Sequence, residues 1–73
     1  MNWRRDNGGQ TYTAQQDNCQ ALVWHTRSGA WRALVSWAGS AVGQADFATL
    51  EAAQAWCEAE VAELTAAGWC TSD

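Results

Sequence analysis

The chain has 73 residues, six of them tryptophan, and its four arginines against eight carboxylates give a net charge of −4. A single domain of this size buries only about 60% of the surface that its unfolded chain exposes, and we expect a core built on the indole rings. So small a core leaves little room for a deep active-site pocket, which favours a binding protein over an enzyme. No segment resembles a signal peptide or a membrane span, so the sequence predicts a cytoplasmic protein without a membrane partner.

Charge is divided unevenly along the chain. Residues 1–45 carry all four arginines against two aspartates, a balance of +2, whereas residues 46–73 carry six carboxylates and no basic residue, a balance of −6. If the first half forms a sheet and the second a helix, the sheet side is mildly positive and the helix side strongly negative. Such an asymmetry orients partners over about one Debye length.

The cysteines are odd in number and widely spaced: Cys19, Cys57 and Cys70. This pattern favours reduced thiols over a disulfide framework, although two of them could pair in an oxidising compartment. With His25 they would complete a set of ligands for zinc, but none of them forms the tight C-x₂₋₄-C pair of structural zinc sites. We therefore expect no metal and no cofactor, with Cys57 as a small apolar core residue.

In chain order, the polar, glycine-rich start predicts a flexible arm over residues 1–10. Residues 11–14 can form a short first strand, and residues 20–26 and 31–37 alternate as strands do. A further strand is expected to end at Phe47.

The loop around Ser28-Gly29 sets the register of the central hairpin. Loops of two and of four residues both place Thr26 opposite Trp31. The core face then carries Leu22, Trp24, Trp31, Ala33, Val35 and Trp37, and the open face carries Ala21, Val23, His25, Arg32, Leu34 and Ser36. A three-residue loop at Ala38-Gly39-Ser40 would add Ala41, Gly43, Ala45 and Phe47 to the core face, whereas a two-residue loop would turn Gln44 and Asp46 inward.

An alanine-rich helix follows, with Thr49 as its N-cap and Gly68 as the left-handed residue after its end, from which Trp69 would fold back onto Leu64. Its apolar stripe is Leu50, Ala53, Cys57, Val61 and Leu64. The prediction is an α+β fold, a single domain over residues 11–70 with a loose C-terminus at residues 71–73. A three-stranded or four-stranded antiparallel sheet packs against one C-terminal helix.

The sequence over roughly residues 20–60 resembles the plant-type AP2 DNA-binding domain and its relatives in phage integrases. The residues that carry the likeness are Trp31-x-Ala33-x-Val35 followed by Phe47-x-Thr49-x-Glu51-x-Ala53. The resemblance implies a three-stranded sheet, backed by one helix, whose open face lies in the DNA major groove. On that analogy Arg27, Arg32, Trp3, Arg4 and Arg5 would face nucleic acid. Four arginines and an isoelectric point near 4.6, however, provide few phosphate contacts.

Three functions are compared. A non-enzymatic protein-interaction or inhibitor module comes first, similar in size and charge to phage and mobile-element inhibitors such as anti-CRISPR proteins. Nucleic-acid binding is the alternative, and catalysis comes last because His25 has no evident carboxylate or cysteine partner. The candidate binding residues are Val23, His25, Arg27, Arg32, Leu34, Arg4 and Arg5, with Glu51, Glu58 and Glu63 as an acidic helix face for a basic partner. The pattern predicts no particular oligomeric state.

Overall fold

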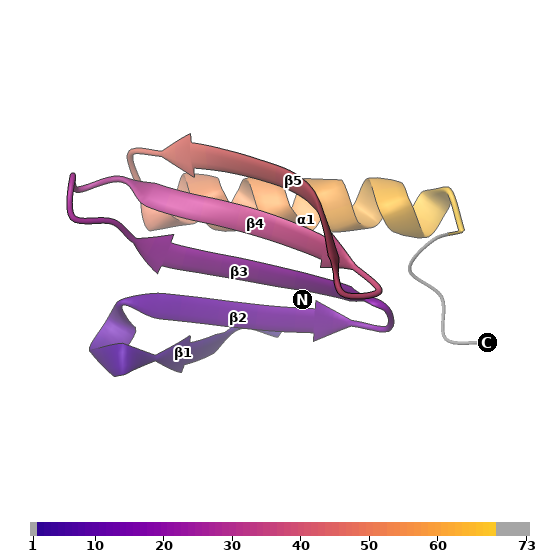
Figure 1. The fold of residues 1–73 in the computed structure, drawn as a ribbon, viewed down its shortest axis with the longest axis horizontal. Coiled ribbons are helices and arrows are strands. Elements are labelled where there is room, and N and C mark those ends of the chain that lie inside the picture. Colours follow the sequence, from indigo (N-terminus) through magenta and orange to yellow (C-terminus); the bar gives the residue numbers. More distant parts are fainter. Residues whose placement is uncertain (1, 69–73) are drawn as a thin grey trace.

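The computed structural model describes residues 2–68 and consists of one antiparallel sheet with a single helix against one of its faces (Figure 1). The strands lie side by side in chain order: β1 (Arg4–Asp6), β2 (Thr11–Gln16), β3 (Cys19–His25), β4 (Trp31–Trp37) and β5 (Ser40–Phe47). A short 3₁₀ turn, η1 (Asn7–Gly9), joins β1 to β2, and the helix α1 (Leu50–Ala66) follows β5. The α+β class is confirmed, but the sheet has five strands where three or four were predicted.

The additional strand, β1, lies within the segment predicted to be a flexible arm. It pairs with β2, with Arg4 opposite Thr13 and Asp6 opposite Thr11. No apolar alternation marks residues 4–6, so local pattern gives no sign of a strand there.

The hairpin between β3 and β4 closes through a three-residue loop, Arg27–Gly29. The Thr26 amide donates to the Ala30 carbonyl at 2.8 Å, and Gly29 takes the left-handed φ of 90° that such a loop requires. His25 therefore lies opposite Trp31, so the predicted register is wrong by one residue. The shift turns all of β3 over. Ala21 and Val23 are buried under the helix, whereas Leu22 and Trp24 are on the open face.

In the hairpin between β4 and β5, most residues of β5 lie on the predicted faces, although the loop length differs from the prediction. Its turn has only two residues, Ala38 and Gly39, both with positive φ, and a β-bulge between Val35 and Ser36 then shifts the register. The turn is one residue shorter than predicted, and the bulge adds one residue to β5, so the two differences cancel beyond the bulge. Gly43, Ala45 and Phe47 therefore face the helix as predicted, and Gln44 and Asp46 stay exposed. Ala41 pairs with Ser36 and is exposed, so its predicted place on the core face is wrong.

The core between sheet and helix is built on small side chains. Its buried members are Ala14, Cys19, Ala21, Val23, Ala33, Val35, Ala53, Cys57 and Val61. Aromatic side chains, among them Trp31, Trp37, Phe47 and Trp56, surround this centre and are only partly buried. These aromatic side chains therefore surround the core instead of forming its centre. The helix lies close to the strands because the side chains between them are mainly alanine and valine.

Both predicted helix ends are confirmed. The Thr49 hydroxyl accepts from the Ala52 amide at 3.2 Å, and Gly68 takes the left-handed conformation, with φ of 84°, just beyond the C-cap. Ala53, Cys57 and Val61 of the predicted stripe are buried. The expected contact of Trp69 and the expected loose residues 71–73 lie outside the described residues.

The cysteines differ from the expectation of reduced thiols. Cys19 is fully buried at the start of β3 and is disulfide-bonded, whereas Cys57 is a free, buried thiol on α1. A covalent bond at Cys19 adds a constraint beyond the small core, which disfavours the unfolded chain. Cys70 lies outside the described residues.

Candidate functional site

The face of the sheet opposite α1 is uncovered in the described part of the chain (Figure 1). Leu22 on β3 and Leu34 on β4 lie directly opposite each other at its centre. Trp24 follows on β3, opposite Arg32, and all four side chains are partly exposed. Polar residues surround them: Thr13 and Gln44 flank the leucine pair, and Gln15, Gln20 and Ser36 lie nearby on the same face. We call Leu22, Trp24 and Leu34 the open-face patch.

The charges beside this patch are neutralised in pairs. Arg32 donates from Nε and Nη2 to the two carboxylate oxygens of Asp46 on β5, at 2.9 and 3.2 Å. This hydrogen bond, together with the attraction of the guanidinium, lowers the pKa of Asp46 below its ordinary value. Arg4 Nε lies 3.7 Å from Asp6 Oδ1 on the same face. The open face therefore carries no net charge from these four residues.

The other predicted basic residues are elsewhere. Arg5 is opposite Tyr12 on the helix-facing side of β1, and Arg27 is in the β3–β4 loop. His25 ends β3 on the helix-facing side, exposed, with its ring 4.8 Å from that of Trp31. The fold therefore places only Arg4, Arg32 and Leu34 of the predicted binding residues on the open face. Val23 is fully buried on the opposite side and cannot contact a partner.

The predicted acidic face of α1 is divided. Glu58 accepts a 2.9 Å hydrogen bond from Trp3 Nε1, which ties the segment before β1 to the helix. Glu51 and Glu63 are exposed and form no ion pair within the described residues. An acidic surface for a basic partner would therefore consist of Glu51 and Glu63, with Glu58 already engaged.

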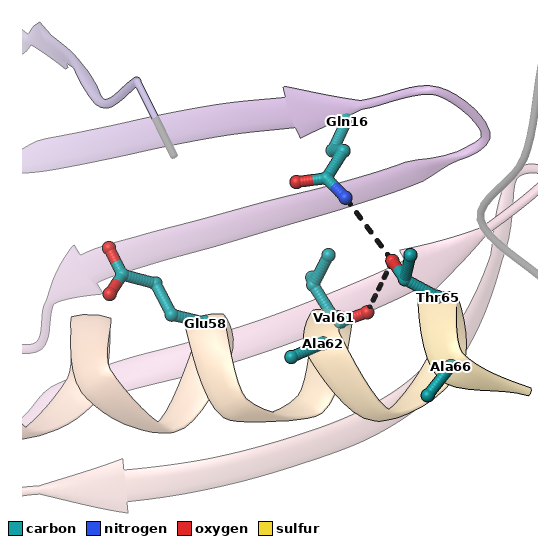
Figure 2. A pocket seen from close by; sticks show the side chains of 6 residues that line it. All are labelled: Gln16, Glu58, Val61, Ala62, Thr65 and Ala66. Carbon is teal, nitrogen blue, oxygen red and sulfur yellow. Dashed lines mark hydrogen bonds between the residues drawn. The ribbon is translucent and has the colours of Figure 1, made fainter.

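A shallow groove of about 410 Å³ lies between β2 and α1 (Figure 2). The amide of Gln16 donates to the Thr65 hydroxyl at 3.2 Å, and this hydroxyl donates to the Val61 carbonyl at 2.8 Å. The remaining lining is Glu58, Ala62 and Ala66. The groove therefore contains one carboxylate and no basic residue, and its one hydroxyl, that of Thr65, already donates to the Val61 carbonyl. Gln16 and Thr65 are far apart in sequence, and no local pattern predicts that they meet.

The free thiol of Cys57 and the possible metal ligands are also poor candidates for catalysis. Burial, and secondarily the negative charges of Glu58 and Glu60, raise the pKa of the Cys57 thiol to about 11. This thiol therefore stays protonated at neutral pH, which is unsuitable for a nucleophile. Among residues 2–68, no group of three or more histidine, cysteine or carboxylate side chains is placed to hold a metal ion.

Comparison with known proteins gives no relative: no protein-family model matches the chain, and no curated protein or solved structure is significantly similar to it. Within the described residues, no helix has both the length and the apolar character needed to cross a membrane.

Proposed function

We propose that this chain is a small, non-enzymatic binding module whose open sheet face docks on another protein. The observation that carries the proposal is the open-face patch, in which Leu22, Trp24 and Leu34 are partly exposed at the centre of the sheet. The centres of protein–protein interfaces are apolar, enriched in aromatic residues and poor in unpaired charge, with a polar rim. This face has each of these properties.

The chemistry of the patch specifies the partner surface. The partner surface is an apolar area of low net charge. Hydrogen-bonding groups at the border of that area can meet the amides and hydroxyls around the leucine pair. A highly basic partner fits this face less well, because Asp46 is already bound by Arg32. The small size and acidic charge of the chain further support an inhibitor of the phage or mobile-element type.

An AP2-like nucleic-acid-binding domain is the alternative. The observation in its favour is Trp24 opposite Arg32, since an aromatic ring and a guanidinium on one open face suit stacking and phosphate contact. Against it, Arg32 and Arg4 would each have to exchange a carboxylate for a phosphate. Few phosphate contacts mean weak, strongly salt-dependent binding.

A capture experiment with matched variants tests the proposal. The immobilised parent is compared with Leu22→Ser/Leu34→Ser, which removes the centre of the patch, and with Glu51→Gln/Glu63→Gln, which alters only the helix. We expect a partner, identified by mass spectrometry and then titrated in purified form, to lose at least about tenfold in affinity for the first variant alone. A purified partner that binds the leucine variant as tightly as the parent contradicts the proposal.

The alternative is tested on labelled DNA and RNA of mixed sequence, at low and at physiological salt. Arg27→Ala/Arg32→Ala is the variant, and its secondary structure is checked by circular dichroism. Salt-sensitive binding that disappears in this variant would favour the nucleic-acid function. We expect no binding by the parent even at low salt.

A further inference from the structure

The two edges of the sheet are unequal. β1 forms one edge with three residues, and β5 forms the other with eight. On an edge strand, alternate backbone amides and carbonyls face outward without a ladder partner. Natural edges are commonly protected by lysine, proline or a β-bulge. This chain contains neither lysine nor proline, and the bulge of β5 lies between Ala41 and Gly43, outside residues 43–47. Within the described part of the chain, residues 43–47 of the β5 edge are therefore available to another strand.

The charge on this edge favours a second copy of the chain. Asp46 is the one ionisable residue of β5, and Arg32 on the adjacent strand binds it through two hydrogen bonds. The seam between two β5 strands therefore contains no unpaired charge, although each chain has a net charge of −4.

The bulge determines which part of β5 can pair. It interrupts the ladder between Ala41 and Gly43, so the regular stretch is residues 43–47. A two-fold axis through the middle of this stretch, at Ala45, matches like faces of the two strands and places both helices on one side of the joined sheet.

This register is also complementary in its side chains. Gln44 lies opposite the second copy's Asp46, so that its amide can donate to the carboxylate on the open face. Gly43 lies opposite the second copy's Phe47 on the helix side. Gly43 has no side chain, and Trp56 lies beside it: a Cβ added at Gly43 would be 3.3 Å from Trp56 Cη2. Phe47 and Trp56 already pack together within one chain, with ring centres 5.9 Å apart.

We propose that two copies of the chain associate through β5, antiparallel about a two-fold axis at Ala45, and form one continuous sheet from two five-stranded halves. The seam is short and falls below the ~1,200 Å² typical of stable interfaces, so association is weak and depends on concentration. The dimer places two open faces side by side, which gives bivalent contact with a repeated partner. The dimer does not depend on the proposed function.

Sedimentation velocity from micromolar to millimolar protein measures the association. Ala45→Lys places two ammonium groups opposite each other at the axis, on the helix side of the joined sheet, whereas Ala41→Lys adds the same side chain to the open face of the same strand, outside the paired stretch. We expect the parent and Ala41→Lys to dimerise alike, and Ala45→Lys to dimerise at least about tenfold more weakly with an unchanged circular dichroism spectrum. A parent that stays monomeric throughout, or equal dimerisation of both lysine variants, overturns the proposal.

Cross-linking tests the register even if Ala45→Lys folds poorly. Directly opposed residues of antiparallel strands have Cα atoms about 4.5–5.5 Å apart, which is within the range of disulfides. Ala45→Cys should form a disulfide-linked dimer under mild oxidation, whereas Ala59→Cys, exposed on α1, should not exceed the parent. Equal cross-linking of both variants contradicts the register. The Leu22→Ser/Leu34→Ser variant should dimerise normally, which separates this proposal from the open-face function.

Discussion

The two faces of β3 carry residues of opposite size. On β3, the buried residues Ala21 and Val23 face the helix, and the alternating residues Leu22 and Trp24 face outward. Small residues allow the helix to lie close, whereas a face that met only solvent would be expected to alternate to polar residues. On β3 the larger apolar residues are therefore on the side that nothing described covers, which supports a partner there.

A charge placed on each face of the same strand should produce the largest difference in stability. Val23→Glu buries a carboxylate with no partner, and we expect it to cost at least about 4 kcal/mol, a large part of the stability of a small domain. Leu22→Glu lies on the open face and should cost less than about 1 kcal/mol. Urea unfolding followed by tryptophan fluorescence measures both values. Equal losses would mean that the open face is not open in solution.

The next largest effect is expected from truncating one of the aromatic side chains that surround the core. Trp31 packs against His25 and Tyr12 on the covered side, with ring centres 4.8 and 6.2 Å away. We expect Trp31→Ala to lower the free energy of unfolding by about 3 kcal/mol, the lower end of the range for large aromatics, because the indole is only partly buried. Trp24→Ala on the open face is the matched control and should cost much less. Thermal unfolding of both variants makes the comparison.

The sequence predicts the order of elements well because each signal is local. The alternation of residues 31–37, the N-cap Thr49 and the stripe around Cys57 depend only on near neighbours, and the structure confirms all three. β1 could not be predicted in this way, because residues 4–6 become a strand only by pairing with β2. Local pattern therefore identifies the elements but not all of the sheet.

The candidate surface depended on a single loop residue. Ser28-Gly29 is compatible with loops of two, three or four residues, and only the three-residue loop turns Trp24 outward and Val23 inward. Arg32 and Leu34, on β4, were placed correctly because their own strand was not shifted. In β4–β5 the short turn and the bulge compensate each other, and most of the predicted face there is correct. Register is therefore the property of the site that composition and periodicity do not determine.

Alkaline pH should weaken the covered layer through Cys57. The folded state raises the pKa of this thiol to about 11, so the unfolded chain loses the proton at a lower pH than the folded one. The stabilisation is complete below the ordinary thiol pKa and is lost as the pH rises from there toward 11. Urea midpoints of the parent should fall over this interval more steeply than those of Cys57→Ala. Parallel pH profiles would show that the thiol is accessible to solvent.

The smallest expected effect is at the rim of the covered layer, where Trp3 Nε1 donates to Glu58 at an exposed site. Trp3→Phe removes the donor and keeps most of the ring, so we expect a loss below about 1 kcal/mol. Glu58→Gln keeps an acceptor oxygen and should cost less than Glu58→Ala. In a double-mutant cycle, Trp3→Phe and Glu58→Ala together should cost less than the sum of the two single changes, because both remove one shared bond. Strict additivity in urea unfolding would mean that the indole does not reach the helix in solution, and that β1 is held only by its ladder with β2.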